Sequence, residues 1–311
     1  MSETVTIRSE GLTARIALLG AELVSLRDAG GAEWMTNGDP AVWSGRAPVL
    51  FPIVGALAGG VYRLDGAEYQ LPRHGFARRR VFHLVERTQS SAILRLTDDA
   101  ETRAVYPFAF VLDLHYALEG DTLTITAIVT NRGEDAMPFS IGFHPGFAWP
   151  LPGGGDKASH RIVFEDFETG PIRRVDSDGL VCAFEDTPVK NRILRPFTGL
   201  FHADALIWDR LSSRSLRFEG EMPKPPEGQE KDRKDRLAPA AIDLAFPDCP
   251  MLGIWQKPGA DFLCLEPWAG IADPQGFDGD FREKPGVMEL PAGDSRSFAL
   301  TLGVRPAQTG E

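Results

Sequence analysis

Alternation of apolar and polar residues runs through the whole chain and predicts strands. The clearest case lies between residues 108 and 129, where apolar side chains take every second position on either side of the sequence EGD at 119–121. Since successive side chains of a strand point to opposite faces, this period of two predicts a long β-hairpin closed by a glycine-bearing turn. Shorter alternating runs predict further strands at residues 62–69, 92–96, 215–218 and 298–302.

Long stretches with helical periodicity are missing, and 32 glycines and 24 prolines break the sequence at short intervals. Frequent turns between short strands are typical of an antiparallel sandwich. We therefore expect an all-β protein in which residues 1–311 form a single domain. At about residues 220–238, charged residues and prolines replace the apolar ones. This composition predicts a solvated loop insertion between two strands, with a lid or a partner-docking loop as the alternative.

Composition and charge narrow the partners. The net charge of −11, from 44 acidic and 33 basic residues, opposes binding to polyanions, so we expect no nucleic acid partner. The first residues carry no signal-peptide pattern and no apolar run has membrane length, which favours a cytoplasmic protein without membrane contact. Three widely spaced cysteines, Cys182, Cys249 and Cys264, are expected to be reduced and buried, with no disulfide or zinc site.

Two histidines stand in unusual surroundings. His74 lies in RHGFAR (73–78) and His144 in IGFHPGF (141–147), each between apolar residues and a glycine or proline that bends the backbone. His144 shares strand parity with the small Ser140 and Gly142, which predicts room for a ligand beside its ring. A lone buried histidine is more often structural, but two in similar settings favour a functional site.

A carboxylate accompanies them in LCLEPW (263–268). Alternation places Glu266 on the same strand face as Cys264, and Pro267 is expected to end the strand directly after it. A carboxylate that points into the interior has a raised pKa, as a general base working near neutral pH requires. A structural carboxylate that accepts from a loop amide is an equal alternative at this point.

Further candidates come from residue types that suit a sugar ligand. Asp204 precedes an apolar run and is either an acceptor for sugar hydroxyls or a turn-forming residue. Arg46 and Arg78 can each donate paired hydrogen bonds to an oxygen-rich ligand. Most of the tryptophans are expected in the core, with one or two, Trp268 among them, available to stack on a sugar ring.

These motifs occur in an order that resembles the aldose 1-epimerase (galactose mutarotase) family, and within it the LacX-like branch. The resemblance rests on APVLFPIVG (47–55), RHGFAR (73–78), IGFHPGF (141–147) and CLEPW (264–268), and it spans essentially the whole chain. It implies a galactose-mutarotase-like antiparallel β-sandwich (a supersandwich) that holds a hexose and uses no cofactor and no metal ion.

The resemblance also implies roles for individual residues. Glu266 would take the proton from the anomeric hydroxyl as general base, and His144 would protonate the ring oxygen as general acid. His74 would hydrogen-bond near the ring oxygen, and Asp204 would accept from sugar hydroxyls. Arg78, Arg46 and Trp268 are expected to complete the substrate site, and a monomer or homodimer is expected.

Two departures from the branch leave the sugar open. Ala56 stands where the branch often has a basic residue, and Arg46 is offset from the arginine of mutarotases. A phosphorylated hexose is therefore an alternative substrate. A non-catalytic carbohydrate-binding protein on the same fold is the first rival function. A glycoside hydrolase that uses Asp204 and Glu266 is the second, and a metal enzyme with His74, His144 and Glu266 as ligands is the third.

Overall fold

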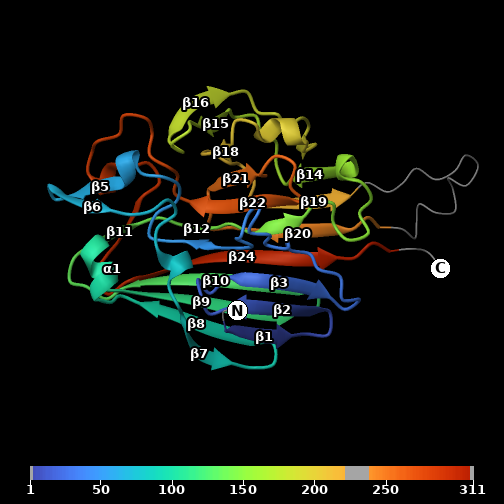
Figure 1. Ribbon diagram of the computed structural model, residues 1–311, viewed down its shortest axis with the longest axis horizontal. Helices are drawn as coiled ribbons and strands as arrows, with labels where there is room; N and C mark the ends of the chain where they lie inside the picture. Colours follow the sequence, from blue (N-terminus) through green and yellow to red (C-terminus); the bar gives the residue numbers. More distant parts are fainter. Residues whose placement is uncertain (1–2, 221–237, 309–311) are drawn as a thin grey trace, which may run out of the picture.

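The computed structural model describes residues 3–220 and 238–308, and strands make up most of its regular structure (Figure 1). Two large antiparallel sheets are present. Within the described ranges the larger sheet has nine strands, in the order β17 (Ile193–Leu194), β14 (His160–Phe164), β19 (Ser215–Gly220), β20 (Ala241–Ala245), β24 (Ser295–Arg305), β10 (Thr122–Asn131), β9 (Phe110–Glu119), β8 (Ser91–Thr97) and β7 (His83–Arg87).

The second large sheet carries the candidate site. Counting only described residues, its eight strands are β16 (Val181–Glu185), β15 (Ile172–Val175), β18 (Leu206–Trp208), β21 (Met251–Trp255), β22 (Phe262–Ala269), β12 (Ile141–Phe143), β4 (Val49–Leu50) and, beside β22, β13 (Gly146–Ala148). Because β12 and β13 pair with β22 in one continuous register, the chain between them, which includes His144, runs alongside Glu266.

Smaller elements surround the two sheets. One three-stranded sheet consists of β1 (Thr4–Arg8), β2 (Leu12–Ala17) and β3 (Leu23–Asp28), and the pairs are β5 (Val61–Leu64) with β6 (Ala67–Gln70) and β11 (Met137–Phe139) with β23 (Met288–Leu290). The helices in the described part are the six-residue α1 (Ala100–Val105) and the 3₁₀ turns η1 (Ala58–Gly60), η2 (Ala77–Arg79), η3 (Lys157–Ser159), η4 (Thr198–Phe201) and η5 (Phe281–Glu283). No helix in these ranges is long and apolar enough to cross a membrane.

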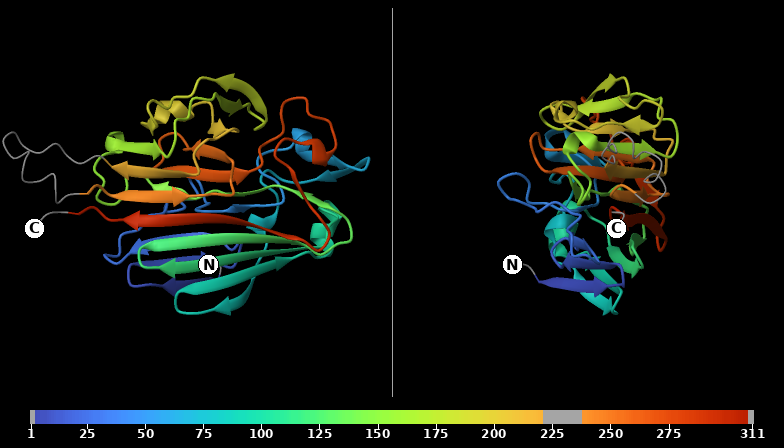
Figure 2. Two further views of the ribbon diagram at one scale, coloured as in Figure 1. Left: turned by 180° about the vertical axis from the view of Figure 1, so that it is seen from behind. Right: turned by 90° about the vertical axis from the view of Figure 1, so that its right-hand side faces the viewer.

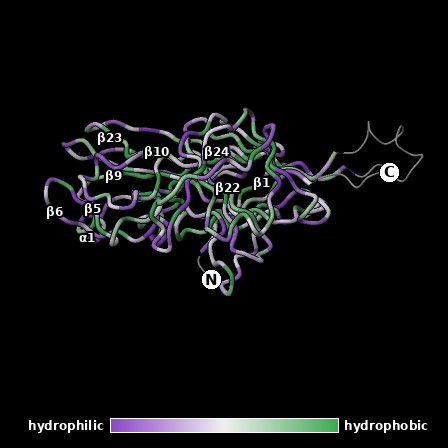
Figure 3. The backbone as a smooth tube through the Cα atoms, turned by 90° about the horizontal axis from the view of Figure 1, so that it is seen from above, coloured by the Kyte–Doolittle hydropathy of each residue, from purple (hydrophilic) through white to green (hydrophobic). Residues whose placement is uncertain are grey.

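The main core lies between the two large sheets, which Figure 2 shows as stacked layers. Leu263 and Leu265 of β22 belong to the same buried apolar cluster as Phe298 and Leu300 of β24. The tube in Figure 3 is accordingly green mainly in the interior and purple mainly at the outer turns. Since side chains alternate along β22, its other face is turned away from this core and carries Glu266. The all-β prediction and this alternation are confirmed.

The predicted hairpin is confirmed in detail. Strands β9 and β10 pair from Thr122 opposite Glu119 to Asn131 opposite Phe110, and Gly120 has a φ of +52° in the turn between them. The strands predicted around residues 62–69, 92–96, 215–218 and 298–302 are found as the hairpin β5–β6 and as β8, β19 and β24.

The prediction that β22 ends at Pro267 is wrong, because the strand continues to Ala269. The backbone N–H of Leu265 donates to Pro145 on the side of β12 and β13, so the nitrogen of Pro267, two residues on, faces the same side. There the ladder is interrupted between β12 and β13. The missing N–H of proline therefore costs no ladder hydrogen bond at this position.

Two further expectations concern the loop insertion and the cysteines. The predicted insertion joins β19 to β20, which pair directly, but residues 221–237 lie outside the described residues. Cys249 and Cys264 are buried as expected, whereas Cys182 is exposed, which corrects the prediction for this thiol. It lies on β16, the edge strand of the eight-stranded sheet.

Candidate active site

A pocket of about 190 Å³ lies on the face of the eight-stranded sheet that is turned away from the main core. Pockets for drug-sized ligands usually measure about 300–1,000 Å³, so this one suits a smaller ligand, about the size of a monosaccharide. It brings together six of the seven residues that the sequence predicted and leaves out Arg46. Its walls are Trp43, Arg73, His74, Arg78, His144, Asp204, Ala205, Trp255, Glu266 and Trp268.

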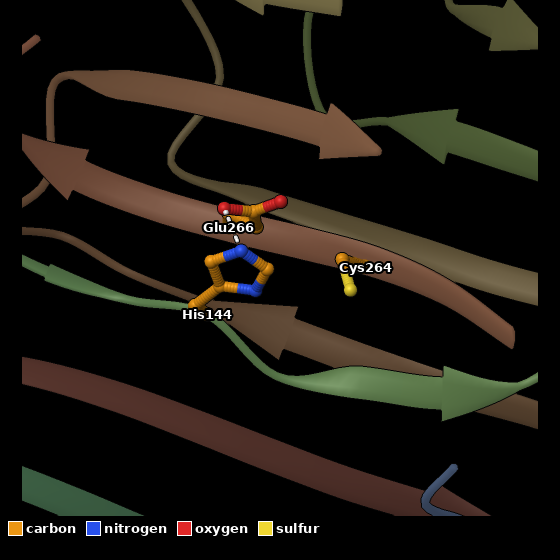
Figure 4. Close-up of side chains that lie close together, drawn as sticks. All are labelled: His144, Cys264 and Glu266. Carbon is orange, nitrogen blue, oxygen red and sulfur yellow. Dashed lines mark ion pairs between the residues drawn. The ribbon is translucent and has the colours of Figure 1, made fainter. Parts of the chain in front are cut away.

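His144 and Glu266 form the buried centre of the pocket. Nε2 of His144 lies 3.1 Å from Oε2 of Glu266, and the side chains are only 9% and 2% exposed (Figure 4). The contact follows from the register, because residues 144 and 266 are opposite each other where β12 gives way to β13. Figure 4 shows the two side chains pointing toward one another from these neighbouring segments.

Aromatic rings surround His144. Its imidazole stacks on Trp43 at a centroid distance of 5.0 Å and meets Trp255 and His74 edge-on at 6.0 and 5.7 Å. This desolvation lowers the pKa of His144 to about 3, and the charges of Arg78 and Arg73 act in the same direction. The room for a ligand expected beside the ring is present, since His144 lines the pocket, but the tryptophans from other segments that pack against the ring were not expected there.

Burial acts on Glu266 in the opposite sense. Desolvation raises the pKa of the Glu266 carboxyl well above its usual value, and nearby Asp204 raises it further while Arg73 opposes the change. The buried pair is therefore held in its neutral form, a protonated carboxyl beside a neutral imidazole. Transfer of one proton across the 3.1 Å contact converts this form into a carboxylate beside an imidazolium without changing the net charge.

His74 is held by backbone contacts that fix its tautomer. The backbone N–H of Gly55 donates to Nδ1 of His74 at 3.1 Å, and the N–H of His74 donates to the Gly55 carbonyl at 2.8 Å. Because Nδ1 accepts, the proton of the neutral ring lies on Nε2. Burial lowers the pKa of His74 well below its usual value, and electrostatic interactions with His144, Arg73 and Arg78 add to the effect. His74 is thus a neutral donor.

The backbone is unusual at two of these residues. His74 and Asp204 have φ angles of +68° and +64°, in the left-handed region that side chains other than glycine rarely adopt. Asp204 is partly compensated, because its own carboxylate accepts from the N–H of Ala205 at 2.8 Å. Strained positions of this kind gather at functional sites, where the surrounding structure holds them in place.

Two arginines differ in how their charges are paired. Arg73 lies 3.7 Å from the carboxylate of Asp204 across the pocket. Arg78 is half-buried, and among the described residues its side chain makes no hydrogen bond or ion pair. Burial lowers the pKa of Arg78, and the charges of Arg79 and Arg73 lower it further. The charge of Glu22 opposes this change, and Arg78 brings to the pocket a donor group that no described residue holds by a hydrogen bond or ion pair.

Trp268 lies flat across its neighbouring strands because both have glycine beneath it. A Cβ atom on Gly142 of β12 would lie 2.5 Å from Cδ1 of Trp268, and one on Gly253 of β21 would lie 2.5 Å from its Cη2. Either contact is closer than real Cβ atoms tolerate. The two glycines therefore form a seat for the indole, whose Nε1 has no hydrogen-bond partner among the described residues.

The prediction that Arg46 contacts the substrate is not supported by its position. Its guanidinium donates to the carbonyl groups of Val24 and Asn37, and its backbone N–H donates to Glu22. These contacts fasten the loop that leads into β4, outside the pocket lining. The donor groups predicted to serve the ligand are therefore used by the backbone.

The pocket also contains residues that the sequence did not single out. Arg73 was overlooked although it is the neighbour of His74 in the RHGFAR run, and this adjacency was a usable signal. Trp43 and Trp255 were expected in the core, and no local pattern shows that they enclose His144.

One group of donor atoms could hold a metal ion. In the described part of the chain, His144, Cys264 and Glu266 each offer a ligand atom within 4.8 Å of the other two, and His74 is not part of the group. Nitrogen, sulfur and carboxylate oxygen are ligands that suit zinc. However, burial and the charge of Glu266 raise the pKa of the Cys264 thiol well above its usual value, whereas metal binding needs the thiolate. Without a metal ion the thiol is therefore held in its protonated form, and a metal ion would have to displace this proton to bind.

Comparison with known proteins identifies relatives of this chain. The profile of the aldose 1-epimerase family matches residues 3–224. The chain is 30% identical to the chromosomal protein LacX of Lactococcus lactis, over 96% of this chain and 99% of that one.

Solved structures are similar over nearly the whole length. A galactose mutarotase related enzyme from Lactobacillus acidophilus is 29% identical with a TM-score of 0.86, over 98% of both chains. A galactose mutarotase-like protein from Lactobacillus casei is 28% identical with a TM-score of 0.87, over 97% of this chain and 100% of that one. With its motifs, its galactose-mutarotase-like sandwich and the match of most of its length, the chain belongs to the aldose 1-epimerase family, in its LacX-like branch.

Proposed function

We propose that the protein is an aldose 1-epimerase that interconverts the α and β anomers of a hexose, with Glu266 as general base and His144 as general acid. The observation that carries the proposal is the buried 3.1 Å contact between these two groups at the centre of a sugar-sized pocket. Membership of a sugar-epimerase family supports the same conclusion.

The reaction needs one group to accept and one to give a proton at the anomeric centre. The carboxylate of Glu266 removes the proton of the anomeric hydroxyl, whose electrons form the carbonyl C1=O1 while the bond from C1 to the ring oxygen breaks. The imidazolium of His144 gives its proton to the ring oxygen. After rotation about C1–C2, the same steps in reverse close the ring on the other face and restore both groups. Each positioned proton transfer contributes about 10²- to 10⁴-fold.

Other residues of the pocket have binding roles in this proposal. The Nε2–H of His74 donates to the ring oxygen region, where negative charge develops as the ring opens. Asp204 accepts from sugar hydroxyls, and the face of Trp268 supports the apolar side of the ring.

Polarimetry on freshly dissolved α-D-glucose and α-D-galactose tests the proposal, with a chelator present throughout. The wild-type protein should accelerate the approach to equilibrium, and Glu266→Gln should lose about 10²-fold or more of this rate. Glu168→Gln is the matched control, because Glu168 is also buried but its carboxylate accepts a hydrogen bond from the backbone N–H of Ser213 and does not line the pocket. It should keep wild-type activity.

The outcomes separate the rival functions. Sugar binding by calorimetry without acceleration of mutarotation would favour a non-catalytic carbohydrate-binding protein. Loss of activity in the chelator would favour the metal enzyme. Wild-type activity in Glu266→Gln would refute its role as the base.

A second candidate substrate is an anionic hexose, such as a phosphorylated one, and the guanidinium of Arg78 favours it, because no described residue holds it by a hydrogen bond or ion pair. In this case glucose 6-phosphate should have a higher kcat/KM than glucose. Arg78→Met should abolish that preference and leave the rate with glucose within about twofold of wild type. Equal kcat/KM values for glucose 6-phosphate and glucose in the wild type would exclude the anionic hexose as the preferred substrate. The proposal of a neutral hexose would then stand.

A further inference from the structure

A fully buried ion pair lies beside the pocket, on residues that the proposed mechanism does not use. Nζ of Lys284 lies 2.6 Å from Oδ1 of Asp273, and the side chains are 0% and 3% exposed. Removing two charges from water is costly, and a buried pair of this kind is often no more stabilising than apolar residues of the same size. Its presence therefore calls for a reason other than stability alone.

Asp273 holds three separate segments together. Its Oδ2 accepts from the backbone N–H of Ala58 at 2.9 Å, and its own N–H donates to the carbonyl of Ala56 at 2.9 Å. Its carbonyl accepts from the N–H of Val181 at 2.8 Å. Asp273 itself follows β22, the strand that carries Glu266, by only a few residues. Lys284 neutralises the charge that this arrangement buries.

The segment held by Asp273 is the one that sets the tautomer of His74. Gly55 donates to Nδ1 of His74 and is adjacent to Ala56. Gly55 has a φ of +77°, and a Cβ atom there would lie 2.5 Å from Cα of Ala272, so the two loops are in direct contact. A continuous path of hydrogen bonds and close contacts thus runs from Lys284 through Asp273 and residues 55–58 to the imidazole of His74.

We propose that Lys284 and Asp273 are positioning residues that hold the Gly55 N–H on Nδ1 of His74, so that its Nε2–H faces the ligand. The value of this arrangement for catalysis rests on the function proposed above, but the tautomer itself does not. If the pair is lost, residues 55–58 move away, Nδ1 loses its donor, and both tautomers of His74 become populated. Loss of a donor to the neutral ring also raises the pKa of His74.

The direct test is NMR of protein labelled with ¹⁵N-histidine, which distinguishes protonated from unprotonated ring nitrogens. The six histidines allow assignment of His74 by a single substitution. In the wild type, Nδ1 of His74 should be unprotonated and Nε2 protonated at neutral pH. In Lys284→Met, which keeps the length of the side chain and removes its charge, the two nitrogens should show averaged protonation. An unchanged tautomer in a folded Lys284→Met would overturn the proposal.

Kinetics provide a second readout that a merely structural role would not change. Lys284→Met should lower kcat about 10- to 100-fold with KM changed by less than about twofold, because a displaced donor weakens the transition state. The acidic limb of the pH profile should move to higher pH as the pKa of His74 rises. If the wild type has no mutarotase activity while the tautomer still changes in the variant, the proposed function fails and the positioning role stands.

Two further variants test the path in case Lys284→Met does not fold: one breaks it at another point, and the other is a control. Ala58→Pro removes only the N–H that donates to Asp273, at the first residue of η1 and after an extended Leu57, where proline is tolerated. It should change the His74 tautomer in the same way, and an unchanged tautomer there would refute the path. Arg95→Met, which breaks the pair with Asp113 on the other large sheet, is the control and should leave His74 unchanged.

Discussion

The seat of Trp268 makes Gly253→Ala a sharp perturbation of the pocket. The new methyl group would stand 2.5 Å from Cη2 and 2.7 Å from Cζ2 of the indole. Gly253 is also directly opposite Glu266 in the ladder, so the change falls beside the proposed base. The backbone of Gly253 is ordinary strand, and an alanine there suffers no strain of its own.

The size of the effect follows from these distances. Carbon atoms in good contact lie about 3.5–4.0 Å apart, so the indole must move by about 1 Å, away from the sheet and into the pocket that it lines. A displacement of about 1 Å can lower the rate about 100-fold. Overpacking costs about 1–3 kcal/mol, and the reduced entropy of the unfolded chain offsets about 0.4–1 kcal/mol of this.

Polarimetry gives kcat/KM, and thermal melting gives the change in stability. Gly253→Ala should reduce kcat/KM by about 10- to 100-fold and lower the melting temperature. Gly303→Ala is the matched control, because Gly303 also lies in a strand, β24, and its Cβ would meet Asp243 at an ordinary 3.5 Å. This control should keep full activity and be slightly more stable than the wild type.

The comparison between the two glycine variants tests whether close contact with β21 holds Trp268 in place. If Gly253→Ala matched Gly303→Ala in both kcat/KM and melting temperature, Trp268 would not be held by close contact with β21. The reasoning about a glycine seat would then be wrong.

Three further predictions concern ionisation and exposure. Burial raises the folded-state pKa of Glu266, so the protonated carboxyl stabilises the folded protein fully only below the unfolded pKa of about 4.3. This stabilisation is lost as the pH rises through the folded pKa. The free energy of unfolding falls by about 1.4 kcal/mol for each pH unit between the two pKa values. Glu266→Gln should therefore gain thermal stability over the wild type as the pH rises from about 4 to about 8, and a difference that does not vary with pH would contradict this cause. Trp43→Leu should let water reach His144 and raise its pKa from about 3 toward the usual histidine value, measured by NMR titration; an unmoved titration would show that Trp43 does not desolvate the ring. Cys182 should react quickly with a thiol reagent in the folded protein, while the two buried cysteines react only after unfolding; a fast thiol that remains in Cys182→Ser would be inconsistent with the described exposure.

Sequence patterns were most informative for properties that depend on a single strand, such as the face to which a side chain points. The period of two placed Cys264 and Glu266 on one face of the strand, and the structure brings their side chains together as this parity predicts. The same reasoning failed for Pro267, because its effect depends on the interruption between β12 and β13, which are remote in sequence from β22.

The surroundings of the site depend on contacts between distant segments, and these left less trace in the sequence. Strand parity suggested space beside His144, and the pocket provides it, but parity gave no sign that Trp43 and Trp255 pack against the ring from other parts of the chain. Arg46 has the right residue type, yet its donors bind the carbonyl groups of Val24 and Asn37. The sequence identified six of the pocket residues, whereas the contacts of each side chain required the fold.

The burial of His144 against Glu266 has a consequence for how protons circulate. In the proposed reaction Glu266 returns the proton it took and His144 regains the proton it gave when the ring closes, so a turnover exchanges no proton with water. Since the two groups are in contact and nearly sealed from solvent, the resting state is restored within the pair itself. Turnover should then be independent of buffer concentration, in contrast to uncatalysed mutarotation, in which external acids and bases must carry the protons.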